Sequence, residues 1–133
     1  MAQINSLLNA FVVVVVLIAA LAWVGTPAPP RPLPNDAQFV SQIQQPGTVL
    51  VKFGAEWCPP CRMIENELDT LARMPSEHVS VVKIDIDKNQ ALARHYQVSS
   101  IPHLFLFQDG KEVGSVRGFR NCEQLKAWIA KSH

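Results

Sequence analysis

The chain has 133 residues, with 12 Lys and Arg against 11 Asp and Glu, and a formal net charge of +1 at neutral pH. Both signs are scattered through its second part, so the charge pattern favours neither nucleic acid nor an anionic surface as a partner. Composition divides the chain into residues 1–25, an N-terminal membrane anchor or uncleaved signal, residues 26–34, a proline-rich spacer, and residues 35–133, one small domain.

The first predicted element is a membrane-spanning helix over residues 7–24. This stretch is apolar except for Asn9 and contains five consecutive valines at 12–16. At about 1.5 Å per helical residue, its length nearly matches a hydrocarbon core of roughly 30 Å. The Ala20-Leu21-Ala22 triplet resembles a signal-peptide cleavage site, but no basic residue precedes the apolar run. We therefore expect an uncleaved, single-pass anchor.

The spacer, residues 26–34, contains five prolines, which exclude a regular helix or sheet. We expect an extended, semi-rigid segment with few tertiary contacts. Charge says little about orientation, because only Arg31 lies close to the apolar run. Export followed by a proline-rich spacer favours a bacterial inner-membrane protein with its domain in the periplasm. The cytoplasmic face is the alternative.

Helix and strand patterns alternate after the spacer. Asn35 and Gln38 have the spacing of a helix N-cap, which predicts a helix to about Gln45. The apolar run 48–54 predicts a buried strand. The later patterns predict a helix at 62–73, a strand at 78–86, a helix at 88–96, a hairpin of strands 103–108 and 112–117 about Asp109-Gly110, and a helix from a cap at Asn121 to Ala130. This order is typical of an α/β domain with a central mixed β-sheet flanked by helices.

The most informative motif is Trp57-Cys58-Pro59-Pro60-Cys61, which follows the predicted strand and precedes a predicted helix. Residues three apart share a helical face, so the two sulfurs can bond with little backbone movement. If Cys58 lies just before the first turn, backbone N–H groups and the helix dipole favour its thiolate. Cys61, one turn inside, is then shielded and attacks second.

The two prolines fit the first turn of a helix and have no N–H to donate to the Cys58 sulfur. The thiolate is then less stabilised than in the strongest oxidants of this chemistry, which favours a reductant. Two other uses of the cysteine pair stay open. One is an inert structural disulfide, and the other is half of a zinc site completed by Cys122 with His78, His95 or His103.

These residues and those that follow resemble the thioredoxin family. The matching segments, in the family's order and spacing, are Val49 to Cys61, Lys83-Ile-Asp-Ile-Asp87, Ser100-Ile-Pro-His103, Phe107-Gln-Asp-Gly110 and Gly118. The resemblance covers residues 35–133 and implies the thioredoxin fold, with Cys58 as nucleophile and Cys61 as resolving thiol. It also implies a cis peptide before Pro102, facing the cysteines, and a substrate groove rimmed by Trp57, Ile101 and Gly118.

The resemblance further implies a thiol–disulfide oxidoreductase that uses no metal or organic cofactor. Such an enzyme forms a mixed disulfide between Cys58 and a client protein, which Cys61 resolves, and an upstream dithiol protein reduces it again. We expect it to reduce the disulfides of its clients. The alternatives are a disulfide oxidase or isomerase, and a low-turnover interaction module in membrane protein assembly.

Two residues of the predicted strand depart from the family's pattern. Lys52 stands where the family typically has a buried aspartate that assists proton transfer at the resolving cysteine. A charged, dry lysine costs several kcal/mol, so we expect Lys52 to lose its proton more easily or to reach water. It then acts as a base, as a cation that favours thiolates, or as a bystander. Gly54 replaces the usual aromatic residue, which uncovers one side of the site or leaves room for another group.

Two further residues invite a functional interpretation. His103, directly after Pro102, is expected to be a surface residue, with titration near neutral pH beside the thiols as the alternative. Cys122 is expected to begin the last helix, where the dipole favours a thiolate, but to lie far from Cys58. We expect a bystander there, with capping by a mixed disulfide as the alternative.

Overall fold

The computed structural model describes residues 10, 12–16 and 31–132. Residues 12–16 are helical, and their valine side chains are exposed. Within the described residues, no helix is long and apolar enough to cross a membrane. Apart from residues 10 and 12–16, the predicted span 7–24 lies outside the described residues.

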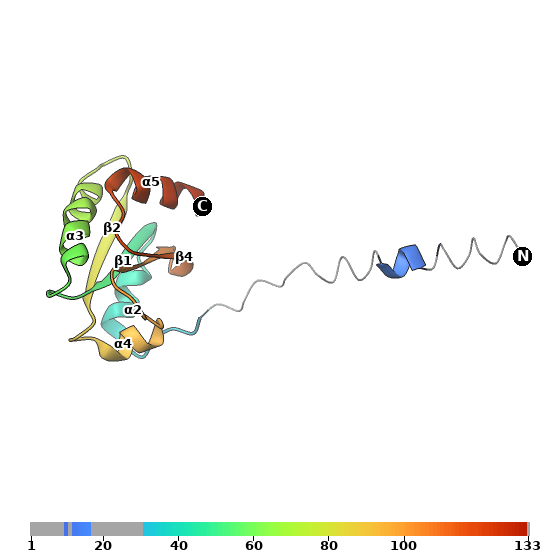
Figure 1. Ribbon diagram of the computed structural model, residues 1–133, viewed down its shortest axis with the longest axis horizontal. Coiled ribbons are helices and arrows are strands. Elements are labelled where there is room, and N and C mark those ends of the chain that lie inside the picture. The colour runs from blue at the N-terminus through green and yellow to red at the C-terminus, as the bar shows by residue number, and fades with distance from the viewer. Residues whose placement is uncertain (1–9, 11, 17–30, 133) are drawn as a thin grey trace, which may run out of the picture.

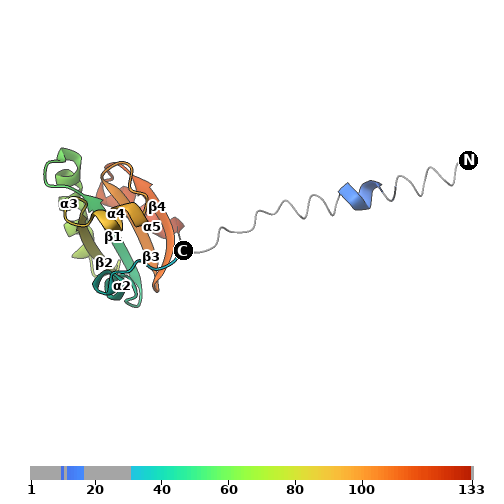
Figure 2. The same ribbon diagram turned by 90° about the horizontal axis from the view of Figure 1, so that it is seen from below.

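Within residues 31–132 the chain forms one four-stranded sheet with helices on both faces (Figures 1 and 2). The elements are α2 (Ala37–Ile43), β1 (Thr48–Gly54), α3 (Pro59–Ala72), β2 (Val79–Asp85), α4 (Gln90–His95), β3 (His103–Gln108), β4 (Lys111–Arg117) and α5 (Cys122–Lys131). The strand order is β2-β1-β3-β4, with β1 parallel to β2 and the other neighbours antiparallel. The predicted mixed α/β sheet is confirmed.

Alternation along β1 and β3 builds a hydrophobic core on each face of the sheet. All seven residues of β1 are buried, as the sequence predicts. On one face, α3 and α5 pack on the leucines of the two strands: Leu50, Leu104 and Leu106. On the other face, α2 and α4 pack on a largely aromatic set: Val49, Val51, Phe53, Phe105 and Phe107. The two cores hold β1 rigidly, and β1 leads directly into the cysteine motif.

The helix caps show how local hydrogen bonding sets the element bounds. Asn121 and Gln124 form the predicted capping box at the start of α5. The predicted cap of Asn35 with Gln38 is wrong, because Asp36 is the N-cap of α2 and its carboxylate accepts the Phe39 amide at 2.9 Å. Aspartate is as good a cap as asparagine. The helix that begins after Asp36 buries Phe39 and ends at Ile43.

The hairpin turn between β3 and β4 is confirmed. Asp109 and Gly110 have φ values of 47° and 81°, the left-handed pair that a type I′ turn requires. The Asp109 carboxylate also accepts the amide of Gly47 at 2.8 Å. The turn is thereby fixed against the loop that leads into β1.

The end of the spacer contacts the domain, so the expectation of few tertiary contacts is wrong for Arg31 and Pro32. The Arg31 guanidinium lies 4.9 Å from the centroid of the Tyr96 ring and donates to the carbonyl oxygen of His95 at 2.9 Å. Its Nε lies 3.5 Å from the Glu112 carboxylate, and Nε2 of His95 lies 2.9 Å from the carbonyl oxygen of Pro32. This segment enters the domain beside α4 (Figure 1). A planar cation that stacks on an aromatic ring explains the one charged residue in the proline run.

We expect Arg31→Ala to lower the free energy of unfolding by about 1–2 kcal/mol, because it removes a cation–π contact and a charged hydrogen bond. Arg31→Lys keeps the charge but loses the planar stack, so it is expected to recover less than half of that loss. Urea unfolding measures both variants. Lys131→Ala, at the exposed end of α5, is the control. An unfolding midpoint unchanged in Arg31→Ala would show that this contact adds no stability.

Candidate active site

The cysteine motif forms the N-terminus of α3. Cys58 is the N-cap, with φ −93° and ψ 108°, and the two prolines are the first helical residues. Cys58 and Cys61 form a disulfide, with their Cα atoms 5.2 Å apart. The amide of Cys61 also donates to the Cys58 sulfur at 3.3 Å. Because prolines have no N–H, this amide is the first in the helix able to stabilise negative charge on that sulfur.

Both cysteines are buried while the disulfide is closed. Cys58 is 4% exposed and Cys61 is fully buried. The reason is that Ala55, Ile86 and Ile101 pack around the disulfide. Cys58 remains the more accessible of the two sulfur-bearing residues.

The predicted rim residues gather beside the disulfide. The peptide bond between Ile101 and Pro102 is cis, as the resemblance implies, and Ile101 packs on the two cysteines. The carbonyl oxygen of Pro102 accepts the amide of Gly118 at 2.8 Å. Gly118 has a φ of 83°, a left-handed conformation that favours glycine. Ile101 thus contacts the cysteines, and Gly118, from a second loop, is hydrogen-bonded to the residue after Ile101.

Trp57 provides a large apolar surface directly before Cys58. Its side chain is 66% exposed, and the indole N–H donates to the carboxylate of Asp87 at 2.8 Å. Asp87 follows β2 and was not predicted as a site residue. An exposed ring that is fixed by its polar end suits contact with a partner protein.

Lys52 has a counter-ion that the sequence analysis missed. Lys52 is 4% exposed in the middle of β1, and its ammonium group forms an ion pair with the carboxylate of Glu65 on α3. The predicted escape to water is therefore wrong, because a carboxylate from the neighbouring helix satisfies the charge. The sequence spacing could have indicated this partner, because Glu65 is four residues after Cys61 and so shares its helical face.

The space beside Gly54 is occupied by Lys52. A Cβ at position 54 would lie 2.8 Å from Cε and 3.0 Å from Nζ of Lys52, and 3.2 Å from the sulfur of Cys61. The expectation that Gly54 leaves room for another group is confirmed. That group is the lysine two residues earlier in the same strand, and its side chain extends toward the space beside the Cys61 sulfur.

His103 is buried, which corrects both expectations for it. It is 2% exposed and packs against Phe105, with ring centroids 4.3 Å apart. Neither ring nitrogen has a hydrogen-bond partner among the described residues. Burial lowers the pKa of His103 to about 4, and the positive charges of Arg117 and Arg31 lower it further in the same direction. The imidazole is therefore neutral at pH 7 and does not titrate near it.

Cys122 begins α5 as predicted, but the expected preference for its thiolate is wrong. Burial raises the pKa of the Cys122 thiol, and the carboxylates of Glu123 and Glu67 add to that effect. The described residues contain no group of three or more His, Cys, Asp or Glu side chains that could hold a metal ion. The histidines considered for a zinc site are thus not gathered with Cys122 around the cysteine pair.

The comparisons with known proteins agree with this geometry. The sequence model of the thioredoxin family matches residues 32–131. The chain belongs to the thioredoxin family. A thioredoxin of Chlamydia pneumoniae is 51% identical over 86 residues, which are 64% of this chain and 82% of that protein. A thioredoxin of Staphylococcus aureus is 42% identical over 97 residues, which are 73% of this chain and 92% of that protein.

Solved thioredoxin structures agree as well. A mutant thioredoxin from Halobacterium salinarum superposes with a TM-score of 0.67 at 38% identity, covering 81% of this chain and 96% of the other. Family membership together with the Cys58–Cys61 disulfide makes the chain a thiol–disulfide oxidoreductase.

The buried His103 predicts a loss of stability in acid. Because its pKa is about 4 in the folded protein and 6.5 ordinarily, the unfolded chain binds the proton first as the pH falls. The stabilising effect is complete above pH 6.5 and is lost toward pH 4. One pKa unit corresponds to about 1.4 kcal/mol, so we expect a loss of about 3 kcal/mol between pH 7 and pH 4.

Urea unfolding at pH 7, 5.5 and 4 measures this dependence. His103→Leu is expected to remove it, because leucine fills a similar space without an ionisable group. His78→Asn is the comparison, since that residue is exposed. If His103→Leu loses as much stability between pH 7 and pH 4 as the unchanged protein, another group is responsible for the acid sensitivity.

Proposed function

We propose that this thioredoxin-family protein reduces disulfides of client proteins while its domain is tethered to the bacterial inner membrane and faces the periplasm. The observation that carries the dithiol roles is the position of Cys58 as N-cap of α3, where its sulfur accepts the Cys61 amide. A sulfur in that place is stabilised as an anion, which is the attacking form. Cys58 is therefore the nucleophile and Cys61 the resolving thiol.

The reaction proceeds in two exchanges. The Cys58 thiolate attacks a client disulfide, forms a mixed disulfide and releases one client thiolate. Cys61, as a thiolate, then attacks the Cys58 sulfur, releases the second client thiolate and closes the disulfide that the structure contains. Two electrons pass to the client, and an upstream dithiol protein returns them. Each step forms one sulfur–sulfur bond and breaks another, so the chemistry requires neither a metal nor an organic cofactor.

The reducing direction is supported by the two prolines that begin α3. They occupy the positions whose amides would otherwise donate to the N-cap sulfur. Fewer donors stabilise the Cys58 thiolate less, which makes the dithiol a better electron donor than a strongly oxidising one. An oxidase or isomerase would need a reduced form stabilised beyond this.

The client is proposed to bind across the rim around the disulfide. Trp57 offers an exposed apolar ring, and Ile101 packs directly on the two cysteines. Gly118 and Pro102 lie against each other next to that contact. An extended segment of the client, with its disulfide over Cys58, fits a shallow rim of this kind.

The tether is proposed from the apolar run at 7–24, which has the length of a membrane span and lacks the basic start of a signal peptide. The contacts of Arg31 and Pro32 show where the domain receives the preceding chain. The proline-rich residues before them form the connection between domain and membrane.

The thiol roles predict different behaviour for two single-cysteine variants. Cys61→Ser is expected to accumulate a mixed disulfide with client proteins, because the resolving thiol is missing and the first exchange still occurs. Cys58→Ser is expected to trap nothing. Non-reducing gel electrophoresis of cells that express each variant measures the adducts. Cys122→Ser, which keeps the pair intact, is the control.

Equal trapping by the two variants would reverse or remove the assigned roles. The unchanged protein is also expected to reduce insulin with dithiothreitol as electron source. If it introduces disulfides into reduced proteins but leaves insulin oxidised, the reducing direction is wrong.

The tether predicts a membrane-bound protein with an intact N-terminus. Fractionation and mass measurement are expected to find the whole chain in membranes. A thiol probe that cannot cross the bilayer is expected to label reduced Cys58 from the periplasmic side. A soluble form that lacks residues 1–22 would disprove the anchor, and labelling only after lysis would disprove the orientation. Cys58→Ser gives the background of labelling.

A further inference from the structure

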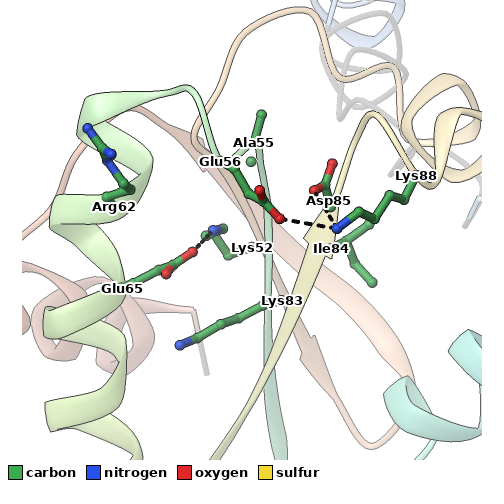
Figure 3. Close-up of a pocket in the computed structure, with 10 residues that line it drawn as sticks. Lys52, Ala55, Glu56, Arg62, Glu65, Lys83, Ile84, Asp85 and Lys88 are labelled. Carbon is green, nitrogen blue, oxygen red and sulfur yellow. Dashed lines mark hydrogen bonds and ion pairs between the residues drawn. The ribbon is translucent and has the colours of Figure 1, made fainter.

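The Lys52–Glu65 ion pair lies at a charged cleft between α3 and β2 with a volume of about 580 Å³ (Figure 3). Lys52 comes from β1 at the buried side, whereas the Glu65 side chain is 38% exposed. Five other charged residues line the cleft: Glu56, Arg62, Lys83, Asp85 and Lys88. The pair thus connects a buried ammonium group to water through one carboxylate.

The outer lysines of the cleft have acidic partners of their own. Lys88 lies 3.1 Å from the carboxylate of Glu56 and 3.7 Å from that of Asp85. Lys83 lies 2.7 Å from the carboxylate of Asp69. Lys52 differs from both in its burial and in its neighbour, the Cys61 sulfur. A Cβ built at position 54 would lie 3.0 Å from Nζ of Lys52 and 3.2 Å from that sulfur, so both groups border the same small space beside Gly54.

The charge near Lys52 changes when the disulfide opens. A closed disulfide is neutral, so Glu65 alone balances the ammonium group. Reduction by a donor dithiol breaks the Cys58–Cys61 bond and oxidises the donor to a disulfide. It leaves two separate cysteines, each of which exchanges a proton with water and is a thiol or a thiolate. A Cys61 thiolate then lies beside the same ammonium group. Interactions between charges are strong at a buried site of low dielectric constant.

We propose that Lys52 is a redox-linked cation whose counter-ion changes: Glu65 balances it when the disulfide is closed, and the Cys61 thiolate competes with Glu65 when the pair is open. Lys52 acts on the sulfur through space and favours the reduced state. Glu65 is the competing anion: it pairs with the ammonium group, and its own negative charge opposes the thiolate. Gly54 provides the space in which the lysine and the sulfur meet.

This inference rests on the proposed role of Cys61 as the resolving thiol, and it is independent of the tether. It predicts shifts of opposite sign for the two halves of the pair. Lys52→Met removes the stabilising cation, so the equilibrium with dithiothreitol is expected to move about tenfold toward the disulfide, about 30 mV more reducing. Glu65→Gln removes a competing anion while keeping the side chain's shape, so the equilibrium is expected to move about threefold toward the dithiol.

Opposite signs separate this role from a structural one, because two variants that merely loosen the site would not shift the potential in opposite directions. The matched controls are Lys83→Met and Asp69→Asn, the neighbouring ion pair on β2 and α3. Neither is expected to change the equilibrium by more than about twofold, because their charges are exposed and screened. Gly54→Ala keeps the lysine but pushes its end away, so it is expected to shift in the direction of Lys52→Met.

The experiment uses the whole chain at pH 8 in dithiothreitol buffers of graded potential, with the reduced fraction read by alkylation and mass. A second reading is the two-phase release of thionitrobenzoate from Ellman's reagent, in which Cys58 reacts first and Cys61 displaces the second group. Lys52→Met is expected to slow the second phase several-fold at pH 7 and to match the unchanged protein at high pH, where the thiol ionises unaided.

Shifts of the same sign in Lys52→Met and Glu65→Gln, or no shift in either, would overturn the counter-ion change. Loss of the second phase in the unchanged protein would instead disprove the resolving role of Cys61, so the two failures are distinct. If Lys52→Met does not fold, Gly54→Ala decides the question, because it displaces the ammonium group and leaves every charge in the chain. An unchanged potential in a folded Gly54→Ala protein would then reject the proposal.

Discussion

A buried ammonium group in the central strand is the constraint around which this site is organised. Lys52 lies among seven buried residues of β1, where an uncompensated charge would cost several kcal/mol. The counter-ion comes from Glu65 on α3, the helix that also begins with the cysteine pair. The ion pair therefore joins the helix of the nucleophile to the strand that supports it. Gly54 is part of the same arrangement, since a larger residue would occupy the path of the lysine.

The sulfurs thus have two different electrostatic neighbours. On the helix side, Cys58 receives one backbone amide, and the two prolines that follow it provide none. On the strand side, Cys61 lies near a cation that is already partly neutralised. Sparse donors disfavour the thiolates, whereas the cation favours them. The balance between the two sets how readily the pair gives up its electrons.

Much of this molecule follows from local sequence patterns, and most of the exceptions share one physical cause. The cysteine spacing, the capping box at Asn121 and the turn at Asp109-Gly110 depend on residues close together in the chain, and all three are found as predicted. Glu65 as a partner and the docking of Arg31 depend on contacts between separate elements. The burial of His103 likewise arises from packing against the sheet's aromatic face, which a single residue in a strand pattern does not reveal.

The docking of Arg31 has a consequence for how far the reactive sulfurs can travel. If the chain is held at residue 24, only residues 25–30 separate the end of the span from the residue fixed on Tyr96 and His95. Six residues extend at most about 22 Å, against about 36 Å for the ten residues up to Pro34. If the proposed tether holds the domain, this shorter connection would confine it to a thin layer above the bilayer and limit its rotation. Disulfides presented within that layer would then be reached far more often than those of freely diffusing proteins.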